Sequence, residues 1–168
     1  MSGGIIVYTD GGARPNPGEA AYGLVVFVDG SIVKGHGNYL GDGKSNNYAE
    51  YHGIMHGLRE IWAHLMTIDD EHARSRTTCT LYSDSELAIK QLRGEYKVRS
   101  ADLMPFYTEA CEIMNEIKSH RVVMRVEHVL RARNTLADDL VRRARSAKSR
   151  VDAELTFRID VPKKRARV

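Results

Sequence analysis

Cysteines and long hydrophobic runs are both scarce in this sequence. Cys79 and Cys111 are the two cysteines among 168 residues, too few for a disulfide framework or a four-cysteine zinc site. The longest apolar run, residues 24–28, is far shorter than the roughly 20 residues that cross a membrane, and no basic and then apolar signal segment opens the chain. We therefore expect no secretion and no membrane partner, and a cytoplasmic location.

The composition is typical of one globular domain with a basic end. Hydrophobic residues make up 42% of the chain and charged residues 28%, which is enough apolar material for a core at this length. Residues 142–168 carry ten Lys and Arg against three Asp and Glu, a net of +7, so residues 1–141 carry −4. We expect one domain over residues 1–150 and a basic tail over residues 151–168, which either binds a polyanion or is simply solvated.

Hydrophobic periodicity predicts strands first and then strands alternating with helices. The predicted strands span residues 5–9, 22–28, 31–40, 78–83 and 122–129, with one extra strand considered at 155–161. One predicted helix begins at residue 47, and three more span residues 85–93, 105–120 and 135–149. Residues 69–77 are predicted to be a polar loop. This order predicts an α/β fold, with a five-stranded mixed sheet of antiparallel meander plus parallel strands, flanked by helices.

Acidic residues lie at the ends of several predicted elements. Asp10 closes the first strand and Asp84 ends the fourth, while Glu50 lies in the first turn of the first helix. Asp138 or Asp139 opens the last helix. Taken singly, each acid has a structural explanation as a turn, capping or helix-dipole residue. If the first and fourth strands are neighbours, however, Asp10 and Asp84 emerge at the same edge, where carboxylates repel unless protons or cations neutralise them.

Such a cluster of acids predicts a metal site. Oxygen ligands without clustered Cys or His select hard ions, so Mg²⁺ fits better than zinc, with Mn²⁺ as a substitute. Two ions about 4 Å apart would clamp the attacking and leaving oxygens of a phosphodiester. The predicted reaction class is therefore metal-assisted phosphoryl transfer to water.

Four motifs resemble those of type 1 ribonuclease H. They are Thr9-Asp10-Gly11-Gly12 with Asn16-Pro17-Gly18, Asn46-Asn47-Tyr48-Ala49-Glu50-Tyr51, Ser83-Asp84-Ser85, and residues 134–140 as Asn-x-x-Ala-Asp-x-Leu. They follow the family order across residues 5–144. The resemblance implies the ribonuclease H fold and an endonuclease that hydrolyses the RNA strand of RNA/DNA hybrids by two-metal-ion catalysis. Its products would carry 5′-phosphate and 3′-hydroxyl ends.

The resemblance also implies a role for each acid. Asp10 would bridge two ions, and Glu50 and Asp84 would hold the ion near the leaving group. Asp138 would hold the ion that activates water. The helical pattern alone does not separate Asp138 from Asp139, and the family spacing selects Asp138. In some relatives a flexible His beside the last carboxylate assists product release, and here His128 and Arg131 are both candidates for that role.

Substrate recognition should use the 2′-hydroxyl, which distinguishes RNA from DNA. The small residues Gly11, Gly12 and Ala13 leave backbone exposed for this purpose. The resemblance adds further residues near the groove, which are Asn16, Asn46, Asn47 and Ser85. The alternative is that Asn16 shapes a turn and Asn47 caps the first helix. Glu86 stands where many family members have Gln, and a carboxylate there accepts hydrogen bonds but donates none.

Residues 94–104 are too short to hold the basic protrusion of some family members, so the chain resembles the compact branch. Phosphate binding then falls to other cations, and the candidates are Lys97, Arg99, Arg142, Arg143, Arg145 and residues 163–167. We expect a monomer that binds an RNA/DNA hybrid, and activity on double-stranded RNA stays open.

Two other functions each fit part of the sequence. Gly43-Lys44-Ser45 lies between a strand and a helix, as in a nucleotide-binding phosphate loop, but that pattern needs glycine at position 38, which is Asn38. The other rival is a duplex-binding module that does not cut. The acids argue against it, because a surface that only binds gains nothing from clustered carboxylates.

Overall fold

The computed structural model describes residues 4–154, whose strands form one mixed sheet. The strands are β1 (Gly4–Arg14), β2 (Gly18–Val28), β3 (Ser31–Lys44), β4 (Thr78–Ser83), β5 (Val123–His128) and β6 (Val151–Asp152). Their order across the sheet is β5-β4-β1-β2-β3-β6. The meander β1-β2-β3 is antiparallel, and β4 and β5 are parallel to β1, as predicted.

The sheet has six strands, one more than the five predicted. The sixth is β6, a two-residue strand that pairs with the outer edge of β3 through His36 and Gly37. Two residues are too few to produce a periodic pattern, so hydrophobic periodicity does not predict this strand. The extra strand considered at residues 155–161 lies outside the described residues.

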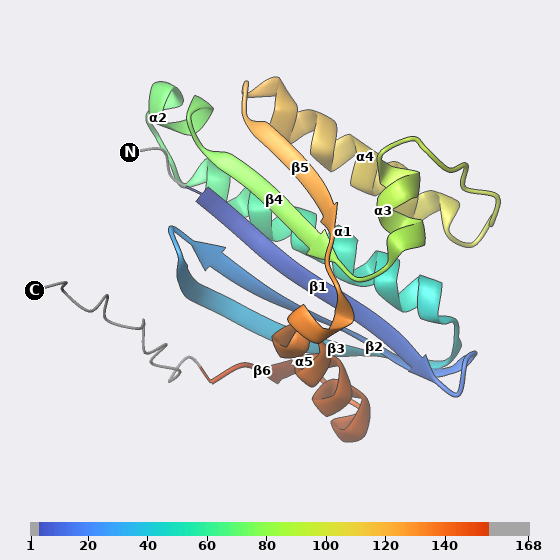
Figure 1. The fold of residues 1–168 in the computed structure, drawn as a ribbon. Helices are drawn as coiled ribbons and strands as arrows, with labels where there is room; N and C mark the ends of the chain where they lie inside the picture. Colours follow the sequence, from blue (N-terminus) through green and yellow to red (C-terminus); the bar gives the residue numbers. More distant parts are fainter. Residues whose placement is uncertain (1–3, 155–168) are drawn as a thin grey trace, which may run out of the picture.

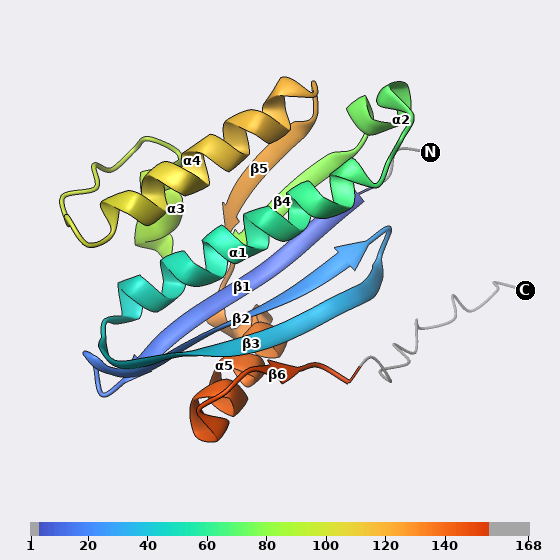
Figure 2. The ribbon, with the colours of Figure 1, turned by 180° about the vertical axis from the view of Figure 1, so that it is seen from behind.

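Helices cover both faces of the sheet (Figures 1 and 2). The long helix α1 (Asn46–Met66) crosses one face of the sheet against β1, and α3 (Glu86–Leu92) and α4 (Met104–Ser119) lie on the same face; α1 is in front of β1 in Figure 2. Helix α5 (Thr135–Ala147) packs on the opposite face against β2 and β3, and a short 3-10 turn, Arg131–Arg133, precedes it. Residues 69–77 are not entirely loop, because Asp70 accepts hydrogen bonds from the backbone of His72 and Ala73 and thereby caps α2 (Glu71–Ser75).

Close packing of the helices against two glycines sets the site's position. A Cβ at Gly11 would lie 2.2 Å from the carbonyl carbon of Ala49, so only glycine allows α1 to approach β1 here. A Cβ at Gly23 would lie 2.5 Å from the carbonyl oxygen of Ala137 in α5. Because Gly23 pairs with Asp10 across β1 and β2, both helices are held close to Asp10 from opposite faces.

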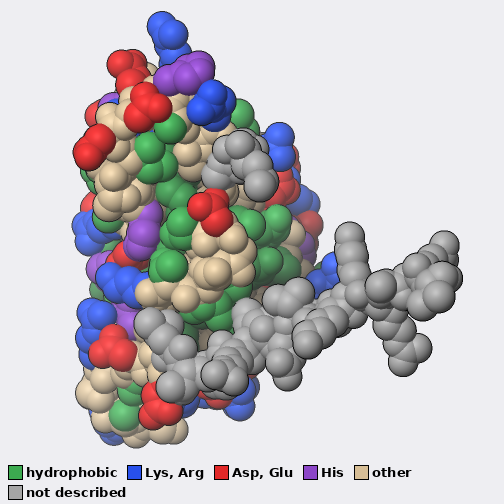
Figure 3. Space-filling model, turned by 90° about the vertical axis from the view of Figure 1, so that its left-hand side faces the viewer, with side chains coloured by type: hydrophobic (Ala, Val, Ile, Leu, Met, Phe, Trp, Pro, Cys, Tyr) green, Lys and Arg blue, Asp and Glu red, His purple; other side chains and the backbone are tan. Residues whose placement is uncertain are grey.

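Within residues 4–154, none of the helices combines the length and the apolar character needed to cross a bilayer. On the side that faces the viewer in Figure 3, acidic, basic and hydrophobic side chains are interspersed. This side therefore shows no concentrated charge of one sign among the residues described.

Candidate active site

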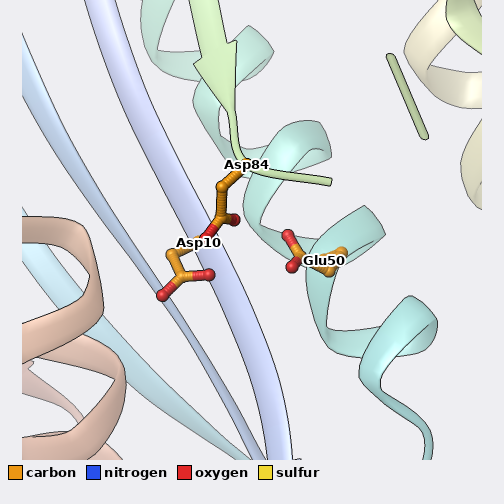
Figure 4. A group of neighbouring side chains, drawn as sticks. All are labelled: Asp10, Glu50 and Asp84. Carbon is orange, nitrogen blue, oxygen red and sulfur yellow. The ribbon is translucent and has the colours of Figure 1, made fainter. Parts of the chain in front are cut away.

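Three carboxylates from separate elements point toward one another (Figure 4). Asp10 lies on β1, Glu50 on α1, and Asp84 directly follows β4. One carboxylate oxygen of each lies within 4.8 Å of those of the other two. Parallel pairing of Thr9 with Ser83 places Asp10 beside Asp84, which is the convergence predicted from the strand order.

Strand β1 extends beyond its predicted end at residue 9 and continues to Arg14, because its pairing with β2 continues. Strand β4 stops at Ser83, so among residues 4–154 no strand pairs with β1 on that side from Asp10 onward. The resulting opening at the edge of β1 is the cleft into which the carboxylates point.

Burial and crowding oppose ionisation of these acids. Burial, together with the charge of Asp84, raises the pKa of Asp10 to about 8. The Gly11 N–H donates a 2.8 Å hydrogen bond to Asp10 Oδ1, which lowers the pKa and so offsets part of this rise. Burial and the charges of Asp10 and Asp84 also raise the pKa of Glu50, against weaker effects of Ser83 and Arg131. Cations bound between the acids would offset the cost of ionising buried carboxylates that repel one another.

The donor set fits a hard divalent cation. The group consists of carboxylates alone, without the Cys or His ligands that zinc sites favour. Asp84 Oδ1 is buried and has no hydrogen-bond partner among residues 4–154, so its lone pairs are left for a ligand other than the protein. The residues present therefore fit a metal site.

Asp138 lies in the same cleft, outside the 4.8 Å group. The cleft has a volume of about 320 Å³, and its lining includes Asp10, Glu50, Asp84 and Asp138. The Asp138 side chain is 24% exposed, and its carboxylate lies 3.2 Å from Arg142 Nε. The Asp139 side chain is 52% exposed and pairs with Arg142 and Arg143 away from the cleft lining. The structure thus separates two aspartates that the helical pattern did not.

The two candidates for assisting product release occupy different places. Arg131 lines the cleft, with its Nη2 3.8 Å from Asp138 Oδ1. His128 is exposed at the end of β5, where it pairs in register with Ser83 and lies near Glu86. Of the two, Arg131 is the one that lines the cleft.

Four of the residues predicted to contact substrate line the cleft, namely Gly11, Gly12, Ala13 and Asn46. The N–H groups of two of them are already paired, since Gly11 donates to Asp10 and Ala13 donates to Asn46 Oδ1 at 2.8 Å. Asn16 Oδ1 accepts a hydrogen bond from Asn46 N–H at 3.0 Å. Asn16 therefore supports Asn46 from outside the cleft lining.

Asn47 and Ser85 lie outside the cleft lining. Asn47 is exposed and borders a neighbouring groove that also includes Tyr48 and Phe106. The alternative that Asn47 caps α1 is wrong, because the N-cap is Ser45, whose Oγ accepts from Tyr48 N–H. Ser85 caps α3 in the same way, with its Oγ accepting from Ala88 N–H at 3.3 Å.

Sequence reasoning gave no role to Asn134 and Arg14, and it did not single out Arg145 among the candidate phosphate-binding cations. Asn134 is buried, and its Nδ2 donates to the Thr9 carbonyl oxygen at 2.8 Å, which ties the start of α5 to β1 beside Asp10. Its place at the head of the fourth motif was a usable signal. Arg14 lines the cleft without any signal in the sequence, and Arg145, which also lines it, stood undistinguished among several surface cations.

Comparison with known proteins points to one family. The family model described as RNase H matches residues 2–146. A protein of Mycobacterium tuberculosis described as bifunctional is 34% identical over 144 residues, which are 85% of this chain and 36% of that protein. Ribonuclease HI of Halobacterium salinarum is 34% identical over 143 residues, or 84% of this chain and 64% of the relative. This chain thus spans about a third of the mycobacterial protein's length.

Solved structures show the same likeness. LC11-RNase H1 in complex with an RNA/DNA hybrid has a TM-score of 0.71 and 32% identity, with 86% of this chain and 98% of that chain covered. The N-terminal RNase H domain of the Mycobacterium tuberculosis protein has a TM-score of 0.68 and 31% identity, with 86% and 94% covered. The fold described above therefore matches structures that share about a third of their residues with this chain.

Proposed function

Because this chain belongs to the ribonuclease H family, we propose that it is an endonuclease that hydrolyses the RNA strand of RNA/DNA hybrids, leaving 5′-phosphate and 3′-hydroxyl ends. The observation that carries this proposal is the convergence of Asp10, Glu50 and Asp84 from three elements within 4.8 Å. A fold alone would not carry it, since one fold can host many chemistries.

We assign two divalent ions to the carboxylates Asp10, Glu50 and Asp84, completed by Asp138 from α5. Mg²⁺ fits this all-oxygen set, and Mn²⁺ is the expected substitute. When bound, two such ions activate the attacking water and stabilise the departing 3′ oxygen. The protein's part is to hold the carboxylates in place, with Asp10 oriented by Gly11 N–H at 2.8 Å and Glu50 by Ser83 Oγ at 3.5 Å.

The hybrid fits the chemistry of the cleft wall. Gly12 has no side chain, so a strand can approach β1 closely, and the Nδ2 group of Asn46 remains a donor for sugar or base oxygens. LC11-RNase H1, which shares the fold, was solved with an RNA/DNA hybrid. Contacts to substrate from Gly11, Ala13 and Asn16 belong to this proposal, as do those from Asn47 and Ser85, which lie outside the cleft lining.

We assign assistance in product release to Arg131 rather than His128, because Arg131 lies 3.8 Å from Asp138. The segment between α3 and α4 is short, so the compact-branch interpretation is part of the proposal. The monomeric state and the cytoplasmic location stay predictions, and activity on double-stranded RNA stays open.

Parallel cleavage assays test the proposal. The full chain is incubated with labelled RNA/DNA, RNA/RNA and DNA/DNA duplexes in Mg²⁺, Mn²⁺ or EDTA. We expect cleavage of the RNA strand in the hybrid with either ion and none with EDTA. The Asp84→Asn variant should not cut, whereas the matched Asp139→Asn variant should. Hybrid binding without cleavage under every ion condition would instead support a binding module.

A further inference from the structure

Two arginines line the cleft that holds the carboxylates. Arg14 ends β1, and Arg145 lies in the last turns of α5. Arg145 is half-buried, and its Nη1 would lie 3.7 Å from a Cβ placed on Gly12, so its guanidinium sits beside the backbone of β1. These two residues, which we call the arginine pair, face the same space as Asp10 and Asp138.

Within the described residues the arginine pair has no ion-pair partner, unlike Arg142 and Arg143 of α5. Among residues 4–154, neither Arg14 nor Arg145 lies within 4.0 Å of a carboxylate oxygen, whereas Arg142 pairs with Asp138 and Arg143 with Asp139. Burial lowers the pKa of Arg145 most, and the like charge of nearby Arg14 lowers it further, against the opposing effects of Asp138 and Asp10. A bound anion would relieve that repulsion.

The position of the pair along the cleft identifies the anion. Arg145 follows Asp138 by seven residues, about two helical turns or roughly 10 Å along α5. Arg14 follows Asp10 by four residues, about 13 Å along an extended strand. Both arginines therefore lie toward the Arg14 end of β1, with the Arg145 guanidinium beside Gly12 and Arg14 near enough for its charge to act on Arg145. A nucleic-acid strand that crosses the carboxylates and continues over Gly12 would bring one of its later phosphates to the arginine pair.

We propose that Arg145, assisted by Arg14, binds a backbone phosphate of the cleaved RNA strand a few nucleotides from the scissile one. This inference rests on the proposed function. Arginine suits such a contact because its planar guanidinium can donate two parallel hydrogen bonds to a phosphate. The contact would set the register of the RNA strand over Asp10, Glu50 and Asp84.

Binding of a fluorescent RNA/DNA hybrid in EDTA, measured across a range of salt, tests the contact without cleavage. Log affinity falls as log salt rises, and each phosphate contact makes this fall steeper by about 0.7 to 0.9. Arg145→Ala should therefore have a slope shallower by that amount, with affinity about tenfold weaker at low salt. Arg145→Lys keeps the charge and should restore the slope. The control is Arg76→Ala, which removes an equal charge from an exposed position between α2 and the start of β4, outside the cleft lining, and should change neither quantity.

A neutral linkage then identifies the phosphate. A single uncharged methylphosphonate at a deoxy step is moved along the RNA strand, one position at a time. One position should weaken binding by wild type but cause no further loss in Arg145→Ala, because both changes remove the same contact. An unchanged salt slope in Arg145→Ala overturns the inference. A second scan places the methylphosphonate along the DNA strand, and the inference is also overturned if the position whose effect disappears in Arg145→Ala lies in that strand.

The two proposals fail in different ways. If the wild-type chain does not cut the hybrid in Mg²⁺, the proposed function fails, and this inference fails with it. If the wild-type chain cuts and the Arg145→Ala variant keeps the wild-type salt slope, the inference fails and the proposed function stands.

Discussion

The Gly11→Ala substitution tests how the fold positions the carboxylates. A Cβ on Gly11 would lie 2.2 Å from Ala49 C, 2.3 Å from Ala49 O and 2.4 Å from Glu50 N. Ordinary van der Waals contact begins near 3.4 Å. More than 1 Å must therefore open between β1 and the first turns of α1. The atoms in conflict are backbone on both sides, so a side-chain rotation does not relieve the clash.

The expected cost follows from this geometry. Overpacking of a close contact costs roughly 1–3 kcal/mol, and a backbone-to-backbone clash belongs at the upper end, about 3 kcal/mol. For a chain of this size each kcal/mol lowers Tm by about 2–4 °C, so Tm should fall by about 6–12 °C. Cleavage should fall as well, because Glu50 N is among the atoms displaced.

Thermal unfolding followed by circular dichroism in EDTA gives the stability change, and hybrid cleavage in Mg²⁺ gives the activity change. The matched control is Gly12→Ala, because the heavy atom nearest its new Cβ is Arg145 Nη1 at 3.7 Å. Its Tm should stay within about 2 °C of wild type. The reasoning is refuted if Gly11→Ala unfolds at the wild-type temperature and cleaves at the wild-type rate.

Three further predictions concern pH, the last carboxylate and the tail. Burial lowers the pKa of His36 from 6.5 to about 4, so the stability from its neutral form is complete above pH 6.5 and is lost between pH 6.5 and 4. Urea unfolding measures this loss. Between pH 6.5 and 4 the free energy of unfolding of His36→Gln should fall by about 2 kcal/mol less than that of wild type, a value that is discounted for partial hydration of the ring. Equal losses in the two proteins would exclude the role of His36. In the cleavage assay, Asp138→Asn should cut at least about a hundredfold more slowly while Asp139→Asn stays near wild type, and equal rates would remove the distinction between them. Deleting residues 162–168 should flatten the salt dependence of hybrid binding, and an unchanged slope would remove the tail from substrate binding.

The local hydrophobic pattern was sufficient to predict how the main strands pair in the sheet. The alternation of strands and helices predicted that β4 would lie parallel to β1, which brings Asp10 and Asp84 to one edge. Contacts between distant segments were not visible in the same way. Strand β6 depends on pairing with the edge of β3, and the extension of β1 beyond Thr9 depends on β2.

The last helix shows why periodicity left one assignment open. The spacing of Leu136, Leu140 and Ala144 predicts that these three residues share the buried face of the helix. In the structure Leu136 is 44% exposed, and the buried residues are Ala137, Leu140, Val141 and Ala144. Measured from that face, Asp138 is nearer than Asp139, which agrees with their exposures of 24% and 52%. Sequence could not supply this correction, because the packing of α5 against Gly23 sets the rotation of the helix.

The cleavage rate of Asp10→Asn with saturating hybrid and Mg²⁺ tests the central claim most directly. The carboxylate cluster is expected to supply several kcal/mol of transition-state stabilisation through the ions it holds, so the rate should fall on the order of 10³-fold or more. Hybrid affinity measured in EDTA should stay within about threefold of wild type, since Asp10 repels rather than binds phosphate. A rate within tenfold of wild type would contradict the account.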